Sequence, residues 1–195
     1  IHHAGKAQWI TPRDERLPDR IRIEGEGAVH GRLVAARFER WPGRGQQTAV
    51  AQVIRSFADN GQAARETESV VYDLGLPVEF LPECLTEAAD ALDSLTDEEI
   101  ARRTDLRSRH LVTIDPQSAR DFDDAVHAEA IAGGRWRVTI AVADVAHYVR
   151  PGTAIDDAAR ERGVSVYLPD RVLPMLPDRL SGDLCSLRPN IDRPA

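Results

Sequence analysis

Between residues 110 and 149, apolar side chains fall into short runs and alternations that predict three strands. Residues 111–114 and 125–131 are apolar runs, which are typical of buried strands when turn residues bound them. Trp136, Val138, Ile140 and Val142 alternate with other residues and predict a third strand with one buried face. Gly133 and Gly134, between the second and third segments, predict a hairpin turn.

The N-terminal third shows only short alternating segments separated by glycines. Residues 20–24, 32–40 and 48–57 read as strands, and no helical period separates them. Several short strands without a helix are typical of a small antiparallel barrel. Residues 59–81 read as a linker in which 70–76 is apolar enough to pack.

Helical signals follow in two places. Pro82 opens a segment in which Leu85, Ala88, Ala89 and Leu92 have the spacing of one helix face. A second short helix is predicted by the capping box of Thr96 and Glu99, and a third covers residues 154–162 and ends at Gly163. Beyond residue 168, the repeated prolines predict extended loops.

Four aspartates lie within ten residues between the first two predicted strands of the central region. They are Asp115, Asp121, Asp123 and Asp124. Carboxylates so close together repel one another, and apolar flanks would make that repulsion costly unless a cation is present. Hard divalent ions such as Mg²⁺ and Mn²⁺ prefer oxygen ligands of this kind. The alternative interpretation is a solvated acidic turn.

The spacing of these aspartates differs from that of an EF-hand loop, which needs Gly at its sixth position and Glu at its twelfth. In a regular strand Asp121 and Asp123 would share one face and Asp124 would point away. We therefore expect either an irregular backbone near Phe122 or a separate role for one aspartate.

The stretch 113–125 reads TIDPQSARDFDDA and resembles the signature of the ribonuclease II/ribonuclease R family, whose catalytic domain is called RNB. Residues 140–149, 162–169 and 180–189 resemble successive blocks of that domain in the same order. Residues 10–16, followed by 31–35, look like the second cold-shock-type OB module that precedes the catalytic domain in such proteins.

The resemblance implies an α+β fold class with three segments. Residues 1–58 would form a cold-shock-like OB module, a small antiparallel barrel that is complete or incomplete. Residues 59–109 would be a linker with the helical N-terminal part of the RNB domain. Residues 110–195 would be the first half of that mixed α/β catalytic domain.

The function implied by the resemblance is a metal-dependent 3′→5′ exoribonuclease. It would hydrolyse single-stranded RNA processively to nucleoside 5′-monophosphates, with Mg²⁺ or Mn²⁺ held by Asp115, Asp121, Asp123 and Asp124. Asp123 matches the position on which the family's chemistry depends most, as a base or as a ligand of a second metal ion.

Four further residues are candidates for substrate binding. Tyr167 matches a family position where an aromatic side chain stacks on the substrate, although a half-buried strand tyrosine is the alternative. Arg120 lies between acids and could neutralise them or contact phosphate, and Arg171 is another candidate phosphate contact, as is Arg162. Trp9 is the candidate for stacking on bases in the OB module, with a core tryptophan as the alternative.

Composition modifies this interpretation in two ways. The net charge of the chain is −7, but residues 1–55 contain ten basic and six acidic residues, a net +4, as expected of a phosphate-binding module. Cys84 and Cys185 show no metal-ligand spacing, which fits a reducing cytoplasm.

No apolar run is long enough to span a membrane. The chain does not begin with Met, so we expect a piece of a longer protein.

We expect a monomer whose parent protein adds the rest of the RNB domain and an S1-type module. Two alternatives stay open. One is an RNB-fold protein that binds RNA without cleaving it, and the other is a Ca²⁺-binding structural module. Among the remaining polar residues, we expect Asp144 to organise the end of the hairpin and His147 to have a structural role.

Overall fold

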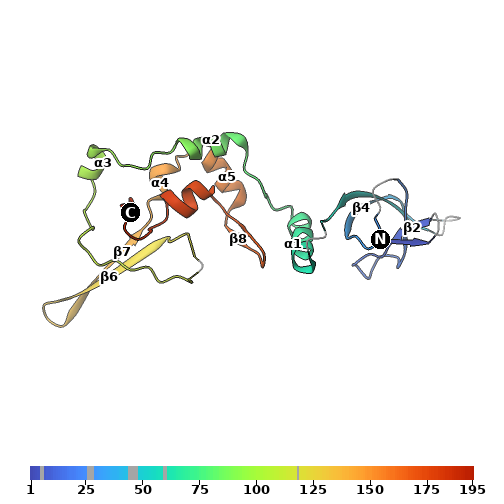
Figure 1. Ribbon diagram of the computed structural model, residues 1–195, viewed down its shortest axis with the longest axis horizontal. Coiled ribbons are helices and arrows are strands. Elements are labelled where there is room, and N and C mark those ends of the chain that lie inside the picture. The colour runs from blue at the N-terminus through green and yellow to red at the C-terminus, as the bar shows by residue number, and fades with distance from the viewer. Residues whose placement is uncertain (5–6, 26–28, 44–47, 59–60, 118) are drawn as a thin grey trace. The chain divides into compact units, whose positions relative to one another are not determined.

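The computed structural model describes residues 1–4, 7–25, 29–43, 48–58, 61–117 and 119–195. They divide into two compact units, Ile1–Leu76 and Pro77–Ala195 (Figure 1). No helix in the described ranges is long and apolar enough to cross a membrane. The last strand of the first unit, β5, ends at Ser56, close to the domain boundary predicted at residue 58. That boundary stays a prediction.

The first unit is built on one five-stranded sheet of order β1-β2-β3-β5-β4. All pairings are antiparallel except that of β3 with β5. The strands are β1 (His2–Ala4), β2 (Ala7–Ile10), β3 (Ile21–Ile23), β4 (Val34–Arg40) and β5 (Val50–Ser56). Ile21 and Ile23 alternate inward along β3 and form a small core with Ala49 and Ala51. The three strands predicted from alternation are confirmed.

Helix α1 (Gln62–Asp73) corrects the linker predicted over this region. Its buried positions are Thr67, Ser69 and Val71, so the face toward the protein is partly polar. Ala63, Ala64, Val70 and Val71 do follow the spacing of one helix face, but Thr67 lies between them and interrupts the apolar pattern, so the helix escaped prediction.

The second unit contains α2 (Pro82–Asp90), α3 (Asp97–Ala101), α4 (Val145–Tyr148) and α5 (Ala154–Arg162). Its strands are β6 (Asp124–Ile131), β7 (Arg135–Val142), β8 (Val166–Tyr167) and β9 (Val172–Leu173), and a π-helical turn, η1, covers Leu180–Leu184. Its core joins the helices to η1 and consists of Cys84, Ala88, Ala143, Ile155, Leu180 and Cys185. Helices α2 and α5 lie side by side (Figure 1).

Helix α2 is confirmed, but of its predicted apolar face only Ala88 is buried. Cys84 and Ala88, four residues apart, are buried, whereas Leu85 and Leu92 are exposed.

The capping box of α3 is confirmed, because Thr96 Oγ1 accepts a hydrogen bond from Glu99 N and the Glu99 carboxylate accepts one from Thr96 N. Helix α5 has its predicted bounds and ends at Gly163, whose φ of 73° favours glycine. The loops predicted after residue 168 contain β9 and η1.

Strands β6 and β7 form a long antiparallel hairpin that projects from the helices of its own unit (Figure 1). The hairpin and its glycine turn are confirmed, but the buried face predicted for β7 is wrong. Trp136, Val138, Ile140 and Val142 are 59–67% exposed, and it is Ala141 that is buried. Residues 111–114 were predicted as a buried strand, yet they form one isolated bridge, Val112 to Val126, and Ile114 is 86% exposed.

Candidate active site

The four aspartates lie on the irregular segment that leads into β6. Asp121 is half-buried, whereas Asp115, Asp123 and Asp124 are exposed, so the burial inferred from the apolar flanks is wrong for three of them. Asp124 is the first residue of β6, and residues 121–123 lie outside any strand. The predicted departure from strand geometry near Phe122 is therefore present.

Hydrogen bonds from distant parts of the second unit fix that irregular backbone. The Ser186 hydroxyl accepts a hydrogen bond from Phe122 N at 3.0 Å and donates one to the carbonyl oxygen of Arg120 at 2.8 Å. Leu187 N donates to the carbonyl oxygen of Phe122, and Ala143 N donates to that of Asp123. The segment is thus held between the end of β7 and the residues that follow η1.

Electrostatic repulsion within the cluster is concentrated on Asp123. Desolvation raises the pKa of the Asp123 carboxyl, and the neighbouring charges of Asp121, Asp115 and Asp124 raise it further. The charges of Asp115, Asp121 and Asp124 therefore all act on the Asp123 carboxylate. A raised pKa means that Asp123 accepts a proton more readily than an ordinary aspartate does.

Tyr167 from β8 reaches this cluster. Its hydroxyl donates a hydrogen bond to Asp121 Oδ2 at 2.9 Å, and that bond is the main cause of a raised pKa of the tyrosine. The Tyr167 side chain remains 67% exposed, which leaves the ring open to solvent. An exposed ring beside the carboxylates is available for stacking on a base.

Among the described residues, no group of three or more His, Cys, Asp or Glu side chains is arranged to hold a metal ion. The chemistry of the donor set nevertheless fits a hard divalent cation. Its donors are all carboxylate oxygens, and a cation would offset the repulsion that raises the pKa of Asp123. Metal binding by Asp115, Asp121, Asp123 and Asp124 stays a prediction.

The other predicted substrate contacts are dispersed. Arg120 is exposed next to the cluster, whereas Arg171 is paired with Asp170 at 2.8 Å. Trp9 is half-buried on β2, outside the main core cluster of its unit, with the Arg20 guanidinium 5.4 Å from its ring centroid. Their roles in RNA binding remain predictions.

Arg162 differs from its predicted role, because its guanidinium makes contacts within the protein. It donates to the carbonyl oxygens of Pro77, Glu79 and Pro174 and lies 3.7 Å from the centroid of the Phe80 ring. These contacts tie the C-terminus of α5 to the segment that precedes α2. Arg162 is therefore a structural residue, and the phosphate contact predicted for it is wrong.

Ser186 is the residue that sequence reasoning missed. It is fully buried, at 0% exposure, and hydrogen-bonds the backbone on both sides of Asp121. The only signal in the sequence was its place in the block 180–189.

Asp144 was predicted to organise the end of the hairpin, and it does so, because its carboxylate caps α4 and pairs with Arg103 at 2.6 Å.

Comparisons with known proteins fit this geometry. The chain matches the cold shock domain over residues 9–80 and the RNB domain over residues 103–195, so the aspartates, Tyr167 and Ser186 all lie in the RNB segment. It is 42% identical over 190 residues to ribonuclease R of Acidithiobacillus ferrooxidans, an alignment that covers 95% of this chain and 43% of that protein.

Two solved structures extend the comparison. Mycoplasma genitalium RNase R in complex with ribose methylated single-stranded RNA aligns with a TM-score of 0.73 and 25% identity over 96% of this chain and 31% of its own. Yeast Ssd1, a pseudonuclease, aligns with a TM-score of 0.60 over 95% of this chain and 24% of its own, and at 22% identity it shows the fold alone. The chain thus spans less than half the length of these relatives.

The predicted α+β fold class is confirmed by the strands of the cold shock domain and by the mixed RNB segment. Both domains follow in the expected order, and 95% of this chain aligns with a ribonuclease R relative, so the chain belongs to the ribonuclease II/ribonuclease R family.

Proposed function

We propose that the protein containing this chain is a metal-dependent 3′→5′ exoribonuclease that degrades single-stranded RNA processively to nucleoside 5′-monophosphates. The observation that carries the proposal is the placement of three other aspartates around Asp123, beside the exposed ring of Tyr167, within the RNB segment. The Mycoplasma genitalium relative was solved with single-stranded RNA, which supports the choice of substrate.

The reaction is hydrolysis of a phosphodiester. Water forms a bond to phosphorus, the bond from phosphorus to the 3′ oxygen breaks, and that oxygen takes a proton as the 5′-monophosphate leaves. Mg²⁺ or Mn²⁺ bound by the aspartates would supply positive charge that polarises the phosphoryl group. The carboxylate of Asp123 either accepts the proton of water or acts as a ligand.

The remaining residues position the substrate. The ring of Tyr167 stacks on a base near the scissile bond, and its hydroxyl fixes the carboxylate of Asp121. Arg120, exposed between Asp115 and Asp121 in the sequence, is placed to meet the RNA backbone. The two cysteines are free and buried, which is consistent with our proposal that the protein acts in a reducing cytoplasm.

The test uses the full-length protein and a 5′-labelled single-stranded RNA. We expect progressive shortening from the 3′ end in Mg²⁺ or Mn²⁺ and no shortening in EDTA. Asp123→Asn should lower turnover by orders of magnitude, since it removes charge with little change of volume, and should leave RNA binding intact. Normal cleavage by this variant would show that the assignment of Asp123 is wrong.

The alternative is an RNB-fold protein that binds RNA without cleaving it. The fold of yeast Ssd1 shows that this architecture also occurs in a protein described as a pseudonuclease. The four aspartates argue for catalysis, because a protein that only binds RNA has no need of a repulsive carboxylate cluster. RNA binding without shortening in any divalent ion would favour the alternative.

A further inference from the structure

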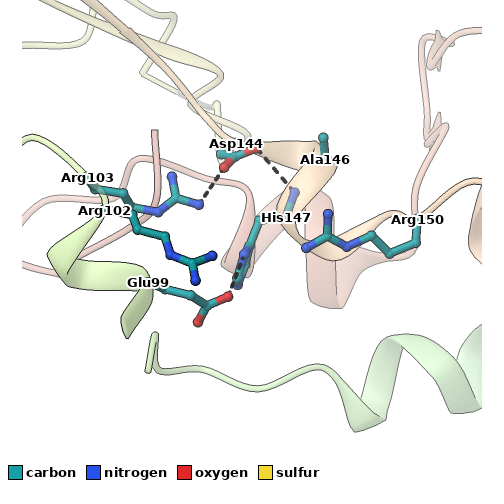
Figure 2. Close-up of a pocket in the computed structure, with 7 residues that line it drawn as sticks. All are labelled: Glu99, Arg102, Arg103, Asp144, Ala146, His147 and Arg150. Atoms are coloured by element: carbon teal, nitrogen blue, oxygen red, sulfur yellow. Dashed lines mark hydrogen bonds and ion pairs between the residues drawn. The ribbon is translucent and has the colours of Figure 1, made fainter. Parts of the chain in front are cut away.

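A second polar site lies in the same unit, outside the aspartate cluster. It is a pocket of about 420 Å³ between α3 and α4, lined by Glu99, Arg102, Arg103, Asp144, Ala146, His147 and Arg150. Figure 2 shows residues from the two helices facing one another across this space. Three of its lining residues are arginines, so the net charge of the pocket depends on how many of them are paired with acids.

Both acidic side chains of the pocket already have partners. Asp144 Oδ2 accepts from Arg103 at 2.6 Å, and Asp144 Oδ1 accepts from His147 N. The Glu99 carboxylate closes the capping box through Thr96 and approaches His147 Nδ1 at 3.4 Å. The acids therefore neutralise Arg103 and fix the ends of the helices.

Two guanidinium groups are left over. In the described part of the chain, neither the Arg102 guanidinium nor the Arg150 guanidinium has a hydrogen-bond or ion-pair partner, and both residues are exposed. In the view of Figure 2 their side chains extend toward His147 from opposite sides. Asp144 offsets the charge of Arg103, and Glu99 lies beside His147. The charges of Arg102 and Arg150 remain, so the pocket has an excess of positive charge.

We propose that this pocket binds a phosphate group of a nucleotide, with Arg102 and Arg150 as its ligands. Guanidinium groups form paired hydrogen bonds with phosphate oxygens, and two unpaired arginines converging on one space fit that ligand. The volume of about 420 Å³ holds more than a phosphate alone.

The pocket is linked directly to the aspartate segment. Ala143 N donates a hydrogen bond to the carbonyl oxygen of Asp123, and the next residue, Asp144, lines the pocket. A strand of RNA held at the aspartates would have further phosphates to place, and the pocket provides cations for one of them. The phosphate comes from the RNA backbone or from a free nucleotide, and the two sources are separable by experiment.

The test compares Arg102→Gln/Arg150→Gln with Arg135→Gln/Arg160→Gln in the full-length protein. The control removes the same charge from exposed arginines of the same unit that lie outside the pocket. Binding of a labelled single-stranded oligoribonucleotide is measured in EDTA over a range of salt concentrations. Separately, inorganic phosphate and a nucleoside 5′-monophosphate are titrated, and the melting temperature is followed.

If the phosphate belongs to RNA, the pocket variant binds RNA about tenfold or more weakly, and its salt slope falls by about 0.7 for each phosphate that the protein no longer neutralises. If the source is a free nucleotide, RNA affinity is unchanged, but phosphate and the monophosphate stabilise only the wild-type protein and the control. The proposal is overturned if pocket and control variants behave alike in both assays.

The RNA arm of this test rests on the proposed function, while the phosphate arm does not. Failure of the wild-type protein to bind RNA would count against the proposed function alone. Equal binding by wild type and pocket variant, with no difference in phosphate stabilisation, would count against the pocket alone.

Discussion

The hydroxyl of Ser186 accepts a hydrogen bond from the backbone nitrogen of Phe122, 64 residues earlier in the chain, at 3.0 Å. The same hydroxyl donates to the carbonyl oxygen of Arg120 at 2.8 Å, so one fully buried side chain spans the backbone around Asp121. The segment that carries the aspartates is therefore shaped by a residue that carries no charge and does not belong to the aspartate cluster.

Replacing Ser186 with Ala should weaken both stability and cleavage. The change leaves the Phe122 N–H without its acceptor, which costs about 1–3 kcal/mol for a group removed from water. We expect the free energy of unfolding in urea to fall by that amount. The RNA cleavage rate should fall as well, since the backbone beside Asp121 loses its support.

Ser181→Ala is the matched control for Ser186. The hydroxyl of Ser181 makes only two long contacts of 3.4 Å to the carbonyl oxygens of Leu176 and Pro177. Its loss should change the free energy of unfolding and the cleavage rate little. If the two variants are equally stable and equally active, Ser186 does not support the segment that carries the aspartates.

Tyr167 combines a hydrogen bond and an exposed ring, and two substitutions separate them. Tyr167→Phe keeps the ring and removes the donor to Asp121, so RNA affinity should stay within about threefold of wild type. Tyr167→Ala also removes the ring and should weaken RNA binding by about 1–3 kcal/mol. Equilibrium binding in EDTA measures the RNA affinity of both variants. Equal losses of affinity in Tyr167→Phe and Tyr167→Ala would rule out stacking.

The elements that could be predicted are those whose signals are local. The hairpin follows from alternation around Gly133 and Gly134, and the start of α3 follows from Thr96 and Glu99, which contact each other within one turn. Helix α5 ends where Gly163 allows a positive φ. Each of these depends on residues within a few positions of one another.

The features that escaped prediction depend on distant residues. Alternation along β7 shows that one face is apolar, but whether Trp136 is covered depends on what packs there, and it is exposed. Helix α1 places Thr67 in the middle of its apolar face, so a polar residue interrupts its period. In the site, the aspartates were found from their spacing, whereas Ser186 could be linked to Phe122 only by the fold.

Cys185 should react slowly with alkylating reagents in the folded protein. Burial raises the pKa of its thiol to about 11, so at pH 8 the thiolate is on the order of 100-fold rarer than for an ordinary cysteine. We expect labelling by iodoacetamide at pH 8 to be slower by a similar factor than in urea. Peptide mapping by mass spectrometry distinguishes Cys185 from Cys84.

The same pKa shift of Cys185 sets a direction for stability. A thiol whose pKa is higher in the folded state favours folding at low pH, and this contribution is lost as the pH rises from about 9 to about 11. Unfolding in urea should therefore become easier over that window. Rapid native-state labelling of Cys185 at pH 8, with the protein still folded, would contradict the burial.

Arg162 provides a test that separates structural from RNA-binding arginines. Its guanidinium donates to three backbone carbonyl oxygens and stacks on Phe80, so Arg162→Gln removes several interactions of a charged donor. Since such hydrogen bonds contribute about 1.5–3 kcal/mol each, we expect the free energy of unfolding to fall by about 2 kcal/mol or more. RNA affinity and its salt dependence should match those of wild type.

Arg160→Gln is the control on the same helix, because Arg160 is exposed and pairs only with Asp156, one turn away. An exposed pair of this kind contributes little, so this variant should be nearly as stable as wild type. If Arg162→Gln instead remains stable and binds RNA more weakly with a smaller salt slope, its guanidinium contacts phosphate, and the carbonyl contacts do not hold α5 in place.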